Sequence, residues 1–169
     1  TQDDFQLQAM IVLDFSASMY ETNEDIDKMT LSAKDLIDSL NETHQVGVVE
    51  FHRPDEPPAL LHAFTTYKNA AKEAIDNFSY GKIYRDFSSC WDAVHKGLKQ
   101  FPEKPDPNVF KTLAFLSDGF DNSSFNTPDD VIALAKERDV HIYALGIGSG
   151  KEEKVLETIA LETGGTYVH

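Results

Sequence analysis

Three oxygen-bearing side chains follow a short apolar stretch near the start of the chain. Asp14, Ser16 and Ser18 come directly after the run AMIVL. That run, Ala9–Leu13, is typical of a strand that is buried on both faces of a sheet. One carboxylate and two hydroxyls at the end of such a strand form a cluster of oxygens, which hard divalent cations prefer as ligands. These residues therefore predict a metal site.

A second carboxylate follows another apolar stretch. Thr112–Leu116 is predicted to be a short buried strand, and Asp118 comes two residues after its end. An aspartate at a strand end is more often a turn former or a helix cap, so neither Asp14 nor Asp118 identifies a metal site alone. Together they would lie at the carboxyl ends of strands, where parallel sheets bind ligands.

The elements that must position these side chains alternate between strand and helix. Predicted strands cover Ala9–Leu13, Gln45–Phe51, Ala59–Phe64, Thr112–Leu116, Val140–Leu145 and Thr166–Val168. Apolar residues at helical spacing occur within residues 26–40, 71–78, 91–101, 131–135 and 155–160. The alternation predicts a Rossmann-like, doubly wound α/β fold, with about six mostly parallel strands and helices on both faces. Pro57 and Pro58 precede Ala59–Phe64, which we expect to be a short antiparallel edge strand.

Two helix starts carry the pattern of a capping box. Thr127 precedes Pro128 and is followed three residues later by Asp130, which predicts a threonine N-cap and a proline at the first helical position. Ser149 with Glu152 predicts a second capping box.

Composition limits the classes of function. The 169 residues carry 29 acidic and 15 basic side chains, a formal net charge of −14, so we expect no nucleic-acid partner. No apolar stretch approaches the roughly 18 residues of a membrane-spanning helix, so we expect no direct membrane insertion. The one cysteine, Cys90, excludes an internal disulfide and a cysteine-based zinc site.

Several dispersed motifs resemble the von Willebrand factor type A (vWA) family. Asp14–Ser18 (DFSAS) is similar to the family's Asp-x-Ser-x-Ser signature. Ser88–Ala93 (SSCWDA) resembles Thr-x-Leu-Tyr-Asp-Ala, and Leu116–Gly119 (LSDG) resembles Leu-Thr-Asp-Gly. Tyr143–Gly148 is similar to the apolar strand and Gly-x-Gly turn that follow in the family. The order and spacing match from about Leu7 to His169, so we expect one vWA domain over residues 1–169, excised from a larger multidomain protein.

The resemblance implies a metal-ion-dependent adhesion site (MIDAS). Five residues would hold the cation, directly or through water: Asp14, Ser16, Ser18, Ser88 and Asp118. The implied cofactor is one divalent cation, Mg²⁺ first, with Ca²⁺ or Mn²⁺ as alternatives. The family usually has threonine at the position of Ser88, and a serine lacks the methyl group that limits the side-chain rotamers. The adjacent Ser89 is an alternative ligand.

Aromatic and charged residues in the loops around the expected cation could form a rim that contacts a ligand. The rim residues are Tyr20, Glu21, Tyr84, Arg85, Phe87, Phe120 and Asp121, and Phe125 lies in the same loops. Aromatic residues and arginine are enriched in protein interfaces, although some of these rings could instead pack beneath the loops. Three hydroxyls and two carboxylates leave a divalent cation under-neutralised, so a partner's carboxylate could complete its coordination.

We therefore expect a non-enzymatic, metal-dependent adhesion module that is monomeric and binds a protein or other ligand with an acidic group. The expected location is extracellular or at the cell surface, with the cytoplasm as the alternative. One alternative function is an intracellular vWA scaffold in a multi-subunit assembly. Another is a metal-dependent phosphoryl-transfer enzyme. Such an enzyme is disfavoured because Ser16 stands where a second carboxylate would be needed, and Arg85 is the only basic candidate for phosphate.

Overall fold

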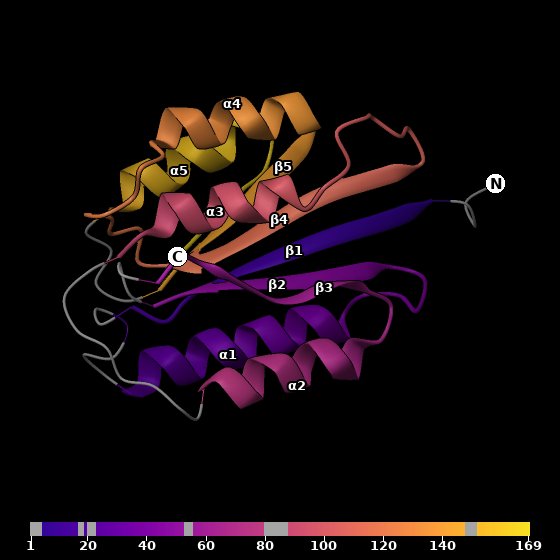
Figure 1. Ribbon diagram of the computed structural model, residues 1–169, viewed down its shortest axis with the longest axis horizontal. Helices are drawn as coiled ribbons and strands as arrows, with labels where there is room; N and C mark the ends of the chain where they lie inside the picture. Colours follow the sequence, from indigo (N-terminus) through magenta and orange to yellow (C-terminus); the bar gives the residue numbers. More distant parts are fainter. Residues whose placement is uncertain (1–4, 17–18, 20–22, 53–55, 80–87, 148–151) are drawn as a thin grey trace.

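The computed structural model describes residues 5–16, 19, 23–52, 56–79, 88–147 and 152–169 (Figure 1). Strands and helices alternate over this part of the chain, as the sequence predicts. The strands are β1 (Gln6–Asp14), β2 (Gln45–Phe51), β3 (Ala59–Thr65), β4 (Val109–Ser117), β5 (Val140–Gly146) and β6 (Tyr167–Val168). The helices are α1 (Asn23–Asp38), α2 (Lys68–Ser79), α3 (Cys90–Lys99), α4 (Pro128–Arg138) and α5 (Glu153–Glu162).

The six strands form one sheet in the order β3-β2-β1-β4-β5-β6. All neighbouring pairs are parallel except β2 and β3, so β3 is the antiparallel edge strand that the sequence predicts. The register places Leu13 opposite Leu116 and Asp14 opposite Phe51. The carboxyl ends of β1 and β4 therefore lie side by side, and Asp14 and Ser117 share one edge of the sheet.

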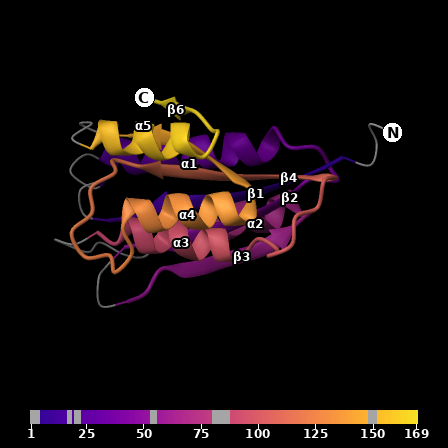
Figure 2. The same cartoon turned by 90° about the horizontal axis from the view of Figure 1, so that it is seen from above.

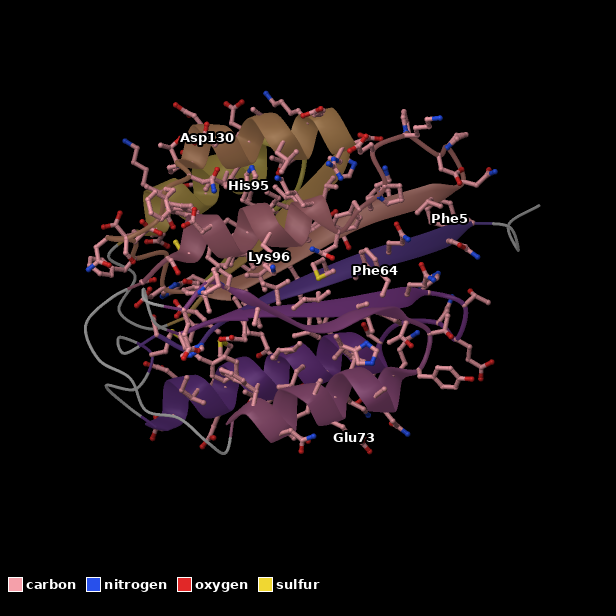
Figure 3. All side chains as sticks on the ribbon, viewed as in Figure 1. Phe5, Phe64, Glu73, His95, Lys96 and Asp130 are labelled. Carbon is pink, nitrogen blue, oxygen red and sulfur yellow. The ribbon has the colours of Figure 1, made fainter. Side chains whose placement is uncertain are left out.

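Helices cover the sheet in two layers. Figures 1 and 2 show α1 and α2 on one face and α3, α4 and α5 on the other. In Figure 3, Glu73 points outward from α2, whereas His95 and Asp130 belong to the opposite layer. This arrangement confirms the predicted doubly wound α/β class. None of the described helices is both long and apolar enough to cross a membrane.

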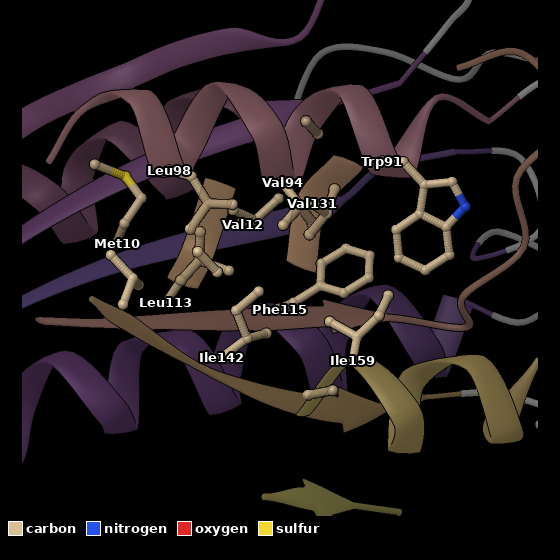
Figure 4. Close-up of a cluster of buried hydrophobic side chains, with 14 of the residues drawn as sticks. Met10, Val12, Trp91, Val94, Leu98, Leu113, Phe115, Val131, Ile142 and Ile159 are labelled. Carbon is tan, nitrogen blue, oxygen red and sulfur yellow. The ribbon is translucent and has the colours of Figure 1, made fainter. Parts of the chain in front are cut away.

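Alternate residues of β1 face different halves of the core. Met10 and Val12 contribute to the core beneath α3, whereas Ile11 and Leu13 face α1 and α2. On the α3 side, the ring centroids of Trp91 and Phe115 lie 5.8 Å apart (Figure 4). Burying such a side chain contributes roughly 1.5–3 kcal/mol. The packing fixes the first turn of α3 at the carboxyl edge of the sheet.

Local sequence correctly predicts the start of α4 but not that of α5. Thr127 Oγ1 accepts a hydrogen bond from the Asp130 backbone N–H (3.2 Å), and the Asp130 carboxylate accepts one from the Thr127 N–H (2.9 Å). The helix start predicted from Ser149 and Glu152 is wrong. Glu152 is itself the N-cap residue of α5, without a side-chain capping bond, so it cannot be the third helical residue of a capping box. Ser149 lies outside the described residues.

Candidate metal centre

Asp14, the last residue of β1, is fully buried with both carboxylate oxygens fixed by hydrogen bonds. Oδ1 accepts from the Ser16 backbone N–H at 2.8 Å and also from the Ser16 hydroxyl. Oδ2 accepts from the Ser117 hydroxyl at 2.6 Å. Neutral donors from β1 and β4 thus hold one carboxylate in a defined orientation.

The surroundings of Asp14 disfavour its negative charge. Burial and the nearby Asp118 carboxylate raise the pKa of Asp14 from 3.8 to about 7, against the opposing effect of the hydrogen bonds from Ser117 and Ser16. No lysine, arginine or histidine in the described ranges forms an ion pair with Asp14 or Asp118. A cation bound at this edge would stabilise both carboxylates.

Asp118 begins the loop that follows β4. It is partly exposed, and its Oδ1 accepts a hydrogen bond from the Phe120 backbone N–H at 3.0 Å. Gly119 has a φ of +78°, and a Cβ built there would lie 2.9 Å from the Leu156 side chain. This turn therefore requires glycine, both for the backbone conformation and for the close approach of α5.

Ser117 is a site residue that the sequence did not single out. Its hydroxyl donates to Asp14 and accepts from the Gly119 backbone N–H at 2.9 Å, so it links the ends of β1 and β4. The available signals were its place directly before Asp118 and its occurrence within the motif Leu116–Gly119. Recognising its role requires knowing that β1 and β4 are neighbours in the sheet.

Two further hydroxyls lie immediately before α3. Ser88 and Ser89 are buried, and neither side-chain oxygen has a hydrogen-bond partner among the described residues. A buried polar group without a partner costs about 1–3 kcal/mol. Cys90, the first residue of α3, has its thiol pKa raised by burial and then by the carboxylates of Asp121, Asp14 and Asp118. The start of α3 therefore faces the same acidic edge as the strand ends.

Asp121, predicted as a rim residue, fastens the loop after β4 onto α3. Its carboxylate accepts hydrogen bonds from the Trp91 backbone N–H (3.3 Å) and the Ser124 backbone N–H (3.2 Å), and also from the Ser124 hydroxyl. Phe120 and Phe125 are 40% and 96% exposed, so both rings are accessible on this loop. Their contact with a ligand stays a prediction.

Ser18, Tyr20, Glu21, Tyr84, Arg85 and Phe87 lie outside the described residues. Hydrogen bonds join Asp14, Ser16 and Ser117, and the electrostatic effect of Asp118 on Asp14 brings that residue into the same group.

The donor set fits a hard divalent cation. No three histidine, cysteine, aspartate or glutamate side chains in the described part of the chain are grouped to hold a metal ion. A cation here would depend on two carboxylates together with serine hydroxyls. Such an all-oxygen set suits Mg²⁺, Ca²⁺ or Mn²⁺. The two buried hydroxyls without partners are the observation that favours this fit.

Several solved structures share this fold. An aerotolerance-related membrane protein from Bacteroides fragilis is 19% identical, with a TM-score of 0.76 over 96% of this chain and 90% of that one. Proximal thread matrix protein 1 from the mussel byssus, with a zinc-occupied MIDAS motif, is 21% identical. Its TM-score is 0.77, and the match covers 98% of this chain but only 44% of the mussel protein. The manganese-loaded TRAP protein of Plasmodium vivax is 19% identical, with a TM-score of 0.67 over 93% and 63% of the two chains.

Sequence comparison identifies the family. No curated protein sequence matches the chain. The profile of the von Willebrand factor type A domain matches residues 10–169, which includes every predicted metal ligand. The chain therefore belongs to the von Willebrand factor type A domain family.

Proposed function

We propose that this vWA domain is a protein-binding module whose binding depends on a divalent cation. Mg²⁺ is the cation that we expect, with Ca²⁺ or Mn²⁺ as alternatives. The residues that would hold the cation are Asp14, Ser16, Ser18, Ser88 and Asp118. Domains of this family are typically interaction modules. A divalent cation bound there would supply a positive charge that attracts a partner's aspartate or glutamate.

One observation carries the proposal. At the carboxyl edge, the buried carboxylate of Asp14 lies beside a second carboxylate, and two buried hydroxyls have no hydrogen-bond partner among the described residues. A folded protein normally pairs buried charges and satisfies buried hydroxyls. An external cation would meet both requirements at once.

Each described residue has a defined part in this proposal. Ser16 and Ser117 orient the Asp14 carboxylate through hydrogen bonds to opposite oxygens. Asp118 adds the second negative charge. The hydroxyl of Ser88 or Ser89 supplies a neutral oxygen, so the site keeps too little negative charge to neutralise a divalent cation fully. A carboxylate from a partner is then favourable at the open position.

The wider biological role is proposed on less direct grounds. An adhesive role at the cell surface fits the complete set of ligand residues in the sequence and the net charge of −14. The mussel and Plasmodium proteins hold zinc and manganese, respectively. At their level of identity they share the fold with this chain, so the cation is inferred from this chain's own oxygens.

The proposal can be tested by calorimetric titration of Mg²⁺, Ca²⁺ and Mn²⁺ into chelator-treated protein. We expect saturable binding near one equivalent, which is lost in Asp14→Asn. The exposed Asp129 provides a matched aspartate-to-asparagine control outside the site. Absence of saturable binding by the folded wild-type protein would contradict the proposal and favour a metal-independent scaffold.

A further inference from the structure

The loop after β4 holds the backbone of Ser88 through four hydrogen bonds. The Ser88 N–H donates to the Asn122 side-chain oxygen at 2.9 Å. The Ser88 carbonyl accepts from the backbone N–H groups of Asn122 (3.1 Å) and Ser123 (3.2 Å). It also accepts from the Ser123 hydroxyl at 2.8 Å. Asn122 and Ser123, two consecutive residues of this loop, thus hold the backbone of Ser88 in place.

The side chain of Ser88 contrasts with its backbone. The residue is 2% exposed, yet its hydroxyl has no hydrogen-bond partner among the described residues. Serine hydroxyls usually bond to nearby backbone groups. Here the N–H and C=O of the same residue are already engaged by the loop after β4, and the hydroxyl has no such bond.

Ser89 is held differently. Its carbonyl accepts from the Ala93 N–H at 3.1 Å, the bond that starts α3. Its own hydroxyl makes no capping bond to the helix. In the described ranges, no residue of the loop after β4 bonds to the Ser89 backbone. Of the two serines, Ser88 is therefore the one whose backbone is bonded, within the described residues, to the loop that carries Asp118.

We propose that Asn122 and Ser123 are positioning residues that make the Ser88 hydroxyl, rather than that of Ser89, the cation ligand. This inference rests on the proposed function. Fixing the Ser88 backbone compensates for the missing methyl group of the threonine that is usual at this position, because it limits the positions the hydroxyl can reach. Groups that orient metal ligands typically change metal affinity by about tenfold to a hundredfold when they are removed.

The test is calorimetric titration of Mg²⁺ into the full 169-residue chain and its variants. Asn122→Ala removes the acceptor for the Ser88 N–H, and we expect a dissociation constant about tenfold higher. Asn122→Asp keeps an acceptor oxygen and should restore binding to at least the wild-type affinity. Asn126→Ala is the matched control in the same loop. The Asn126 side chain bonds to Asp92 instead of Ser88 (2.8 Å), so the affinity should change less than about twofold.

Two serine variants test the choice of ligand. Ser88→Ala should weaken Mg²⁺ binding by about a hundredfold or more, whereas Ser89→Ala should leave the affinity within about threefold of the wild type. The melting temperature of each metal-free variant verifies that it is folded. If Asn122→Ala does not fold, Ser123→Ala removes one bond to the Ser88 carbonyl and should raise the dissociation constant severalfold.

The outcomes separate this inference from the proposed function. Wild-type protein that binds Mg²⁺, with Asn122→Ala and Ser123→Ala indistinguishable from Asn126→Ala, would overturn the positioning role. Loss of binding in Ser89→Ala but not in Ser88→Ala would overturn the choice of ligand. Folded wild-type protein that binds no Mg²⁺ would overturn the proposed function together with this inference.

Discussion

The parallel strands begin at one edge of the sheet (the amino edge) and end at the other (the carboxyl edge). Each edge buries an ionisable side chain, and the described chain gives the two side chains different surroundings. At the amino edge, the buried Lys111 donates its ammonium protons to the carbonyls of Arg138 (3.0 Å) and Pro102 (3.5 Å). At the carboxyl edge, the donors that the described residues give to Asp14 are all neutral and come from Ser16 and Ser117, and a second carboxylate lies nearby. At the amino edge, backbone carbonyls accept hydrogen bonds from the buried ammonium group. The carboxyl edge instead combines two neighbouring carboxylates with serine hydroxyls, which is the type of oxygen cluster that binds a cation.

The side chain of Arg138 completes the amino edge. Its guanidinium donates to the Phe101 carbonyl at 2.6 Å and lies 3.7 Å from the exposed Glu103 carboxylate. Carbonyls at the end of α3 and α4 thus receive the donors that helix termini need. The comparison teaches that buried charge alone does not identify a functional site. The informative features are a second carboxylate beside the buried one and two buried hydroxyls that have no hydrogen-bond partner among the described residues.

The largest expected effect on metal affinity comes from Asp14→Asn. The substitution keeps the size of the side chain and removes its charge, so Mg²⁺ affinity should fall by about a hundredfold or more. Because the ionised Asp14 is destabilised by burial, the free energy of unfolding of the metal-free variant at pH 8 should not fall below that of the wild type. Calorimetric titration and urea denaturation in chelator measure the two quantities. A variant that still binds Mg²⁺ normally would remove the contrast between the edges.

A change of pH should produce the next largest effect. Protons compete with the cation for Asp14, whose folded-state pKa is about 7, so Mg²⁺ affinity should fall by up to tenfold per pH unit below that value. In chelator, the stability of the metal-free protein should depend on pH in the opposite direction. The folded state retains the Asp14 proton up to a higher pH than the unfolded state, so this group's stabilisation is present at acidic pH and lost as the pH rises through about 7.

Calorimetric titrations of Mg²⁺ at pH 5, 6, 7 and 8 test the competition between protons and the cation. For the metal-free protein, the free energy of unfolding is measured at the same pH values for the wild type and for Asp14→Asn, and the difference between the two curves gives the contribution of Asp14. A wild-type affinity that does not change between pH 8 and pH 5 would contradict the assignment of Asp14 as the competing group.

Ser117→Ala should have a smaller effect. It removes one donor to Asp14 and the acceptor for the Gly119 N–H, which loosens the link between β1 and the Asp118 turn. We expect about tenfold weaker Mg²⁺ binding. The Ser123 hydroxyl donates to the Ser88 carbonyl and not to Asp14. Comparing Ser117→Ala with Ser123→Ala therefore distinguishes the effect of a misoriented Asp14 carboxylate from the effect of a misplaced Ser88. A larger loss in Asp14→Asn than in Ser117→Ala is required by this account, and the reverse order would be evidence against it.

Lys111→Met should change metal affinity least. The substitution removes the Lys111 donor from the carbonyls of Arg138 and Pro102, so the free energy of unfolding should fall by about 1–3 kcal/mol. The dissociation constant for Mg²⁺ should stay within about twofold of the wild type, because the amino and carboxyl edges lie at opposite ends of β4. Chemical denaturation and calorimetry measure both, with the exposed Lys104→Met as control. A large change in metal affinity would show that the two edges are coupled.

The sequence predicted the fold well because local rules determine most of it. The antiparallel edge position of β3 follows from the prolines before Ala59, and the start of α4 follows from the chemistry of Thr127 and Asp130. The start predicted for α5 was wrong, because Glu152 is itself the N-cap residue of this helix and makes no side-chain capping bond.

The site was less predictable because it depends on contacts between distant parts of the chain. Asp14 and Ser117 are 103 residues apart in sequence, and Ser88 is held by residues more than 30 positions later. Only the strand order and the packing of α3 bring such residues together.

The most direct test of the central claim is a crystal structure of the wild-type protein grown with Mn²⁺ and measured at the manganese absorption edge. We predict one anomalous peak at the carboxyl edge, with the Ser88 hydroxyl and the Asp14 and Asp118 carboxylates around it. Absence of a peak there at saturating Mn²⁺, or a peak only at another face, would contradict the claim that this edge is a cation site.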